Sequence, residues 1–100
     1  MANKQERDFQ ADLIKELESE YKGSIVTKLA SGHIQGIPDL LILHNNKWAT
    51  LECKASKDAK KQKNQPYYVR KMDKMSFSRF IYPENKEDVL NELKVHFQKA

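Results

Sequence analysis

Two segments separated by a polar turn constrain the fold of this chain more than any other feature. Leu40–Leu43 is a continuous apolar run that opens at Pro38–Asp39, and such a run predicts a strand buried on both faces. Asn45–Asn46 is a turn signal, and residues 47–54 then read as a second strand. The sequence therefore predicts a β-hairpin near the middle of the chain.

The register of this hairpin brings three charged side chains together. Side chains along a strand alternate between its faces, so Glu52 and Lys54 point the same way and Cys53 points into the opposite, apolar layer. If the turn has two residues, counting back places Asp39 opposite Glu52. Directly opposed residues have Cβ atoms roughly 4.5–5.5 Å apart. We therefore expect two carboxylates and one ammonium group at one end of a sheet.

This arrangement indicates phosphodiester hydrolysis with a divalent cation. Neighbouring carboxylates repel each other and resist burial, and a cation such as Mg²⁺ relieves the conflict, since it takes one or two carboxylates and keeps several waters. Such an ion acidifies a bound water and polarises a phosphate, while a lysine orients that water or offsets developing charge. A surface ion pair between Glu52 and Lys54 is the alternative interpretation of that pair alone.

The other segments predict a small α/β domain. Apolar residues spaced four apart predict a helix over residues 6–21, and β-branched residues predict a strand over 24–29. A helix over 64–75, a strand over 77–82 and a last helix after Asn85 follow. The order helix, three strands, helix, strand, helix indicates a mixed sheet flanked by helices, and the 100-residue chain is expected to be a single domain.

The helix ends carry their own predictions. Residues 1–5 read as a frayed start. Asn64 is expected to cap the second helix, and Asn85 with Asp88 resembles a capping box for the third. The predicted buried stripe of the second helix consists of Tyr68, Met72 and Met75.

Composition narrows the setting. The longest apolar run is too short to span a bilayer, and the charged N-terminus does not resemble a signal peptide. One cysteine, Cys53, cannot form an internal disulfide, so a cytoplasmic protein is expected. The net charge of +4 permits a polyanionic partner.

A lysine cluster follows the charged motif. Residues 54–63 carry five lysines against one acid, Asp58. A solvated loop is the ordinary interpretation of such a cluster. Its position beside the motif instead predicts contacts to nucleic-acid phosphates that do not read sequence. The residues predicted to make them are Lys57, Lys60, Lys61, Lys63 and, from the neighbouring strand, Lys28.

The whole pattern resembles the PD-(D/E)xK nuclease superfamily, and most of all its small VRR-NUC and phage Holliday-junction-resolvase-like members. The matching stretches are Phe9–Leu17, Gly36–Leu43 and Leu51–Lys54, with Gln65 on the next helix, so the resemblance spans nearly the whole chain. It implies a restriction-endonuclease-like α-β-β-β-α-β-α fold. It also implies an endodeoxyribonuclease that uses Mg²⁺ or Mn²⁺ and leaves a 5′-phosphate and a 3′-hydroxyl.

The resemblance also implies roles for single residues. Asp39 and Glu52 would hold the metal ion together with the backbone carbonyl of Cys53. Lys54 takes the place of the motif lysine. Gln65 takes the place of a family glutamine and is expected to bond the scissile phosphate or Lys54. These four side chains and one carbonyl form the predicted active site.

One position departs from the family pattern. Many relatives place a glutamate on the first helix facing the metal, where the register against Leu13 and Leu17 puts Gln10 here. Gln10 is therefore predicted to touch the metal site, through its amide oxygen or a metal-bound water. Glu6, one turn earlier, is the second candidate, and plain helix surface is the alternative for both. A neutral ligand would weaken metal affinity or prevent binding of a second ion.

Three functions remain open at this point. The leading hypothesis is a structure-selective endonuclease for branched, flapped or junction DNA, because the chain has neither zinc-ligand spacing nor a basic recognition helix. A homodimer is one way for so small a domain to engage two equivalent strands, and the likeness to phage proteins favours a phage or prophage product acting in the host cell. The second is a non-catalytic nucleic-acid-binding module that retains the nuclease fold. The third is an interaction protein that docks through its acidic first helix.

Overall fold

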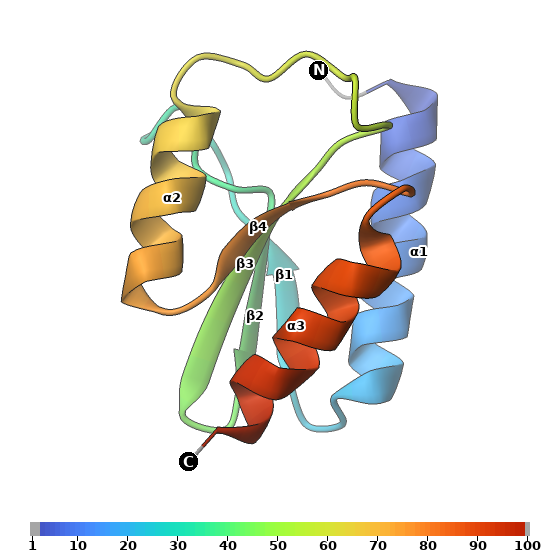
Figure 1. Ribbon diagram of the computed structural model, residues 1–100, viewed down its shortest axis with the longest axis vertical. Helices are drawn as coiled ribbons and strands as arrows, with labels where there is room; N and C mark the ends of the chain where they lie inside the picture. Colours follow the sequence, from blue (N-terminus) through green and yellow to red (C-terminus); the bar gives the residue numbers. More distant parts are fainter. Residues whose placement is uncertain (1–2, 100) are drawn as a thin grey trace.

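The chain forms a four-stranded mixed sheet with three helices, and the computed structural model describes residues 3–99 of it (Figure 1). The elements are α1 (Lys4–Glu20), β1 (Ile25–Lys28), β2 (Leu40–His44), β3 (Lys47–Cys53), α2 (Gln65–Met75), β4 (Ser78–Ile81) and α3 (Lys86–Gln98). The predicted α/β class and the predicted element order are both confirmed. No helix within the described range is long and apolar enough to cross a membrane.

The predicted hairpin lies at the centre of the sheet. The strand order is β1-β2-β3-β4. His44 pairs with Lys47 across the turn, where Asn45 adopts a left-handed φ of 55°. The register continues to Leu40 opposite Leu51, one step short of Asp39 and Glu52. Strand β4 runs parallel to β3, so the ends of these two strands lie at the same edge of the sheet.

The main core lies between one face of the sheet and helices α1 and α3, which stand on the same side in Figure 1. Leu13 and Leu17 of α1 and Leu93 of α3 pack there against Leu51 and Cys53 of β3. Burying each large aliphatic side chain contributes roughly 1.5–3 kcal/mol. Helix α2 lies on the opposite side and covers β3 and β4.

Strand β2 is buried on one face only, so the prediction that it is buried on both faces is wrong. Leu40 and Ile42 are fully buried, whereas Leu43 is 40% exposed. The physical reason is that α2 covers only part of this face of the sheet. It contacts β3 and β4 and leaves the side of β1 and β2 open.

Helix α1 begins earlier than the apolar pattern predicted. Its first residue is Lys4, and the Asn3 side chain caps it by accepting a hydrogen bond from the Glu6 backbone N–H at 2.8 Å. Residues 4 and 5 are therefore helical and not frayed, whereas residues 1 and 2 of the predicted frayed start lie outside the described residues. The cap stabilises a polar first turn that no hydrophobic periodicity reveals.

The two other predicted capping residues occupy the N-cap positions, but neither side chain caps its helix. Asn64 lies before α2 with a left-handed φ of 74°. Asn85 instead bonds the preceding turn, accepting from Tyr82 N at 2.9 Å and donating to Phe80 O at 3.0 Å.

The buried stripe of α2 is shifted from the predicted one. Met75 is 64% exposed, and Val69 is the buried residue of this helix. Tyr68 and Met72 are half-buried. The buried face of α2 therefore includes Val69 and leaves Met75 outside it.

Candidate active site

Glu52 and Lys54 lie on the same face at the end of β3, as strand alternation predicted. Both side chains are almost fully buried. Glu52 is 1% exposed and Lys54 is 6% exposed. The Asp39 side chain reaches the same point, since its Oδ2 accepts a hydrogen bond from the Cys53 backbone N–H at 3.0 Å. The structure thus brings the three predicted motif side chains together.

The two carboxyl groups interact directly. Burial raises the pKa of Glu52 from 4.5 to about 9, and the neighbouring Asp39 carboxyl group adds to the rise. The Lys54 ammonium, with its Nζ 3.9 Å from Glu52 Oε2, opposes this rise only in part. Among residues 3–99, Glu52 Oε1 is buried and has no hydrogen-bond partner. A buried carboxyl oxygen left without a partner is costly, so this oxygen is available to a ligand.

Gln65 holds the other oxygen of Glu52. Its Nε2 donates to Glu52 Oε2 at 2.9 Å, and its Oε1 accepts from the Gln62 backbone N–H at 2.7 Å. The sequence predicted a bond to the scissile phosphate or to Lys54. The observed partner among the site residues is instead the glutamate, so Gln65 fixes the orientation of that carboxyl group.

Gly36 joins the motif loop to the start of α2. Its φ is +90°, and a Cβ there would lie 2.8 Å from both the backbone carbon and the Cβ of Asn64. Only glycine satisfies both requirements. The contact keeps the loop that carries Asp39 against the helix that carries Gln65.

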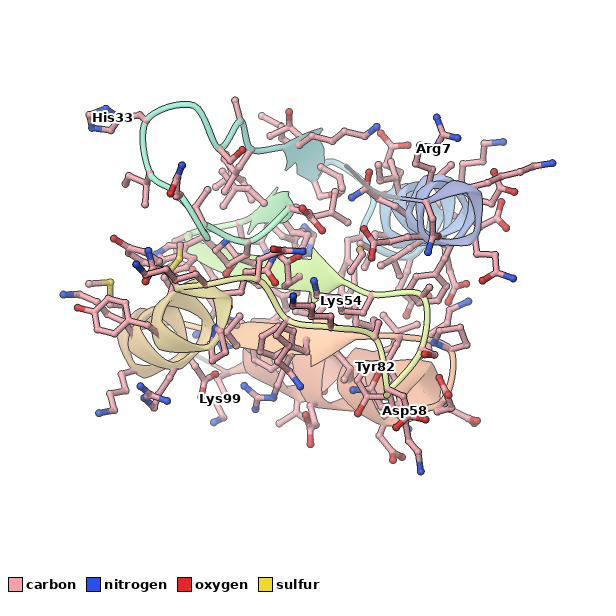
Figure 2. All side chains as sticks on the ribbon, turned by 90° about the horizontal axis from the view of Figure 1, so that it is seen from above. Arg7, His33, Lys54, Asp58, Tyr82 and Lys99 are labelled. Carbon is pink, nitrogen blue, oxygen red and sulfur yellow. The ribbon has the colours of Figure 1, made fainter. Side chains whose placement is uncertain are left out.

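Residues 55–64, here called the strap, cross over this end of the sheet before α2 begins (Figure 1). Lys54 Nζ donates to the Lys60 carbonyl at 3.2 Å, which ties the strap to the buried ammonium. Figure 2 looks down on this end, with Lys54 near the middle of the molecule and Asp58 at the outer bend of the strap. His33 points outward from its loop in the same view.

The predicted DNA-binding lysines separate into two groups. Lys60 and Lys63 line the cleft beside the motif. Lys61 lies over the Phe80 ring, with its Nζ 4.9 Å from the ring centroid. Lys57 and Lys28 are exposed and lie outside the cleft lining.

The cleft has a volume of about 800 Å³ and opens between the strap, α2, α1 and the motif loop. Several polar residues that the sequence analysis did not single out also line it. The only feature of the sequence that could have indicated them is their position, which is in the motif loop, in the strap or at the start of α1. They are Asn3, Ser31, Gln35 and Gln62.

Helix α1 presents Glu6 to the cleft. Burial raises the pKa of Glu6, nearby Lys54 opposes the rise, and Asp39 adds to it. Gln10 is not part of the cleft lining. Burial raises the pKa of the Cys53 thiol, and the Gln10 side chain partly opposes that rise. The structure thus places Glu6 in the cleft lining, whereas Gln10 lies near the Cys53 thiol.

The donor set suits a hard cation that brings its own waters. Within residues 3–99 no group of three or more His, Cys, Asp or Glu side chains is arranged to hold a metal ion. Two carboxyl groups do converge, and one of their oxygens lacks a partner. Mg²⁺ commonly binds through one or two carboxylates and keeps several waters, so Asp39 and Glu52 fit it better than they fit zinc, which prefers nitrogen and sulfur ligands.

A second hollow, of about 240 Å³, lies between α1 and α3. Two of the acids that line it are paired, because Glu16 lies 2.7 Å from Lys86 and Glu20 lies 4.0 Å from Lys94.

Comparisons with known proteins add no relative. No family model, no curated protein and no solved structure matches this chain.

Proposed function

We propose that this chain is a metal-dependent endonuclease that hydrolyses DNA phosphodiester bonds in the cleft. The observation that carries the proposal is the buried meeting of Asp39 and Glu52, where one Glu52 oxygen has no hydrogen-bond partner. A proton or a cation must offset two such carboxylates. Asp39, Glu52 and the Cys53 carbonyl would hold Mg²⁺ or Mn²⁺. When bound, the ion supplies an acidified water and a polarised phosphate.

The side chains around this pair have separate tasks. Lys54 orients or deprotonates the attacking water, or offsets charge on the phosphate. It is held in place by the Lys60 carbonyl. Gln65 orients Glu52 through its bond to Oε2. Asp39 is fixed by the Cys53 backbone N–H.

The rim of the cleft supports a nucleic-acid substrate. Lys60 and Lys63 lie beside the carboxylates and can neutralise backbone phosphates without reading bases. Recognition of shape in branched, flapped or junction DNA, and products with a 5′-phosphate and a 3′-hydroxyl, are part of the proposal. They follow from the resemblance to PD-(D/E)xK nucleases.

A cleavage assay tests the proposal. The protein is incubated with Mg²⁺ or Mn²⁺ and linear, flapped and four-way DNA. The expected result is metal-dependent nicking that falls at least about 100-fold in Lys54→Ala. Lys22→Ala is the matched control, because it removes an exposed lysine outside the cleft lining. Equal activity in both variants, or no nicking by the wild-type chain, would refute the proposal.

A non-catalytic nucleic-acid-binding module is the second candidate. The absence of a three-residue metal cluster among residues 3–99 favours it, as does the place of Gln10 at the Cys53 thiol. This module would bind DNA in a salt-sensitive manner and cut it with neither metal. The same assay separates the two functions.

A further inference from the structure

Helix α2 carries a basic stripe on its outer surface. Tyr67, Arg70, Lys71 and Lys74 are all exposed. Arg70, Lys71 and Lys74 follow Tyr67 by three, four and seven residues, so all four share one face of the helix. The single acid of α2, Asp73, lies off this stripe, where it accepts from the Ser78 backbone N–H at 3.1 Å and pairs with Arg79. The stripe therefore presents positive charge without a neutralising carboxylate of its own helix.

The stripe begins close to the cleft along the chain. Lys63 and Gln65 line the cleft before and at the start of α2, and the stripe begins two residues later. Lys71 leans toward that end, since its Nζ lies 3.4 Å from Tyr67 Oη and 5.7 Å from the Tyr67 ring centroid. From Tyr67 to Lys74 the stripe extends about 10 Å along the helix axis, which matches about three base pairs of duplex.

The other two helices have the opposite charge. Helix α1 carries six acids against three bases, and α3 carries three acids against two bases. Both lie across the sheet from α2 (Figure 1). A polyanion that enters the cleft is therefore repelled on the side of α1 and attracted on the side of α2.

We propose that the stripe formed by Tyr67, Arg70, Lys71 and Lys74 is a second DNA-contacting surface that holds a duplex arm of the substrate outside the cleft. The inference rests on the proposed function and names the form of its substrate. Backbone phosphates are the groups contacted, because flexible cations on one helix face match a line of phosphates. The stripe is not a recognition helix, because it contacts phosphates and does not read bases.

The test measures DNA binding without metal, so that no cleavage takes place. One variant carries Arg70→Ala, Lys71→Ala and Lys74→Ala. The matched control carries Lys15→Ala, Lys22→Ala and Lys99→Ala, which removes the same charge from exposed positions elsewhere. Fluorescence anisotropy follows binding to a duplex of about 20 base pairs and to a single strand of about four nucleotides, over a range of salt concentrations.

We expect the stripe variant to bind the duplex roughly tenfold or more weakly than the control, with a salt slope smaller by roughly 2–3. Its binding to the short strand should equal that of the control. Equal duplex binding by the two variants, or no duplex binding by the wild-type chain, overturns the inference. Thermal unfolding of both variants shows whether a loss reflects misfolding; if the triple variant is unfolded, Arg70→Gln with Lys74→Gln replaces it.

The two proposals fail in different ways. Failure of the endonuclease proposal appears as missing nicks in metal, even where the stripe still binds duplex. Failure of the inference appears as unchanged duplex binding in the stripe variant, even where the wild-type chain nicks DNA.

Discussion

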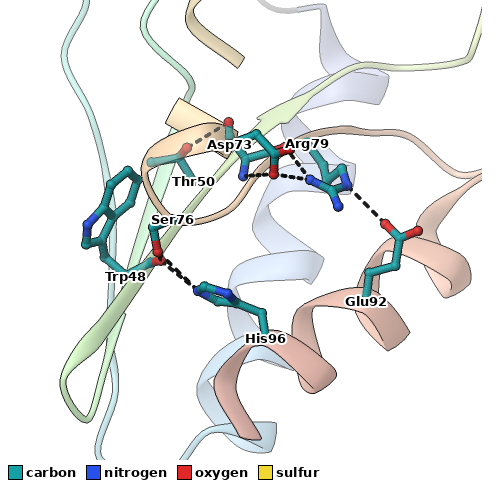
Figure 3. Close-up of polar contacts among 8 residues, drawn as sticks. Trp48, Thr50, Asp73, Ser76, Arg79, Glu92 and His96 are labelled. Atoms are coloured by element: carbon teal, nitrogen blue, oxygen red, sulfur yellow. Dashed lines mark hydrogen bonds and ion pairs between the residues drawn. The ribbon is translucent and has the colours of Figure 1, made fainter. Parts of the chain in front are cut away.

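Two polar regions beside β3 differ in how their groups are paired. Near Trp48 and Thr50, polar groups from α2, β4 and α3 satisfy one another (Figure 3). Thr50 Oγ1 donates to Ser78 Oγ at 2.8 Å, and the Ser76 hydroxyl donates to the Trp48 carbonyl. At the Glu52 end, two carboxyl groups meet and one oxygen has no partner.

The charges show the same contrast. In the first region, Arg79 lies between Asp73 and Glu92, with its Nε 3.0 Å from Glu92 Oε1. In the second, Lys54 is 3.9 Å from Glu52 and does not cancel the effect of burial on that carboxyl group. A fully paired network stabilises the fold, whereas an incompletely paired one marks a site kept for a ligand.

The difference between the two regions is tested most directly by neutralising one glutamate in each. Glu52→Gln should lower the metal-dependent cleavage rate by about 100- to 1,000-fold, because it removes one of the two carboxylates proposed to hold the metal ion. Glu92→Gln, the matched change in the paired region, should leave that rate within about twofold. Cleavage rates on one branched substrate measure both. A similar loss of cleavage rate in the two variants would show that the Glu52 region is no more important for cleavage than the paired region.

The pH dependence of stability sharpens the contrast. The pKa of Glu52 rises from 4.5 to about 9 on folding, so between these values the folded chain binds a proton that the unfolded chain has released. The contribution of Glu52 to stability is therefore largest below about pH 4.5 and falls as the pH rises toward 9, by about 3 kcal/mol at neutral pH.

Denaturant unfolding without metal, from pH 5 to pH 9, measures this effect as the difference between wild type and Glu52→Gln. The variant should gain stability relative to wild type as the pH rises, and saturating Mg²⁺ should reduce the gap by favouring the ionised carboxylate. If the difference in stability between wild type and Glu52→Gln stayed constant from pH 5 to pH 9, the proposal that Glu52 is buried with a raised pKa would be contradicted.

A third prediction concerns the glycine that joins the motif loop to α2. Gly36→Ala should lower the free energy of unfolding by about 1–3 kcal/mol, since its φ is +90° and its Cβ would meet Asn64 at 2.8 Å. Cleavage should fall as well, because Asp39 and Gln65 would separate. Gly32→Ala is the control, because a Cβ there meets nothing within 4 Å. Equal unfolding midpoints for Gly36→Ala and Gly32→Ala would refute the proposed role of the contact between Gly36 and Asn64.

The smallest effect is expected in the paired region. Arg79→Ala should lower the free energy of unfolding by about 0.5–1 kcal/mol, since the arginine and its two partners are partly exposed. Metal-dependent cleavage should not change, as Arg79 does not line the cleft. Urea unfolding and the cleavage assay together test this. A large loss of cleavage would mean that the two regions are coupled.

Much of the fold could be predicted because its signals are local. A turn between two short strands fixes the pairing of His44 with Lys47, and strand alternation then puts Glu52 and Lys54 on one face. Side-chain capping was less predictable. Asn64 and Asn85 had the right residue type, but their side chains make no cap, since the loops before both helices give each asparagine another conformation or partner.

Part of the candidate site was beyond sequence reasoning because it depends on how distant elements pack. Glu6 and Gln10 lie one turn apart on α1, and only the docking of that helix decides that Glu6 enters the cleft. The folding of the strap likewise separates Lys60 from Lys61. The exposure of Met75 has the same origin, since the rotation of α2 against the sheet sets it.

The sequence by itself determined the order of elements, the register of the hairpin and hence the placement of Asp39 near Glu52 and Lys54. Backbone geometry and side-chain alternation act over a few residues, so these results do not depend on the rest of the molecule. Only the tertiary structure decided that Gln65 bonds Glu52, that one oxygen of Glu52 is left without a partner, and that α2 turns its basic stripe to solvent. The physical reason is that burial and pairing are set by contacts between segments far apart in the chain, and those contacts exist only after packing.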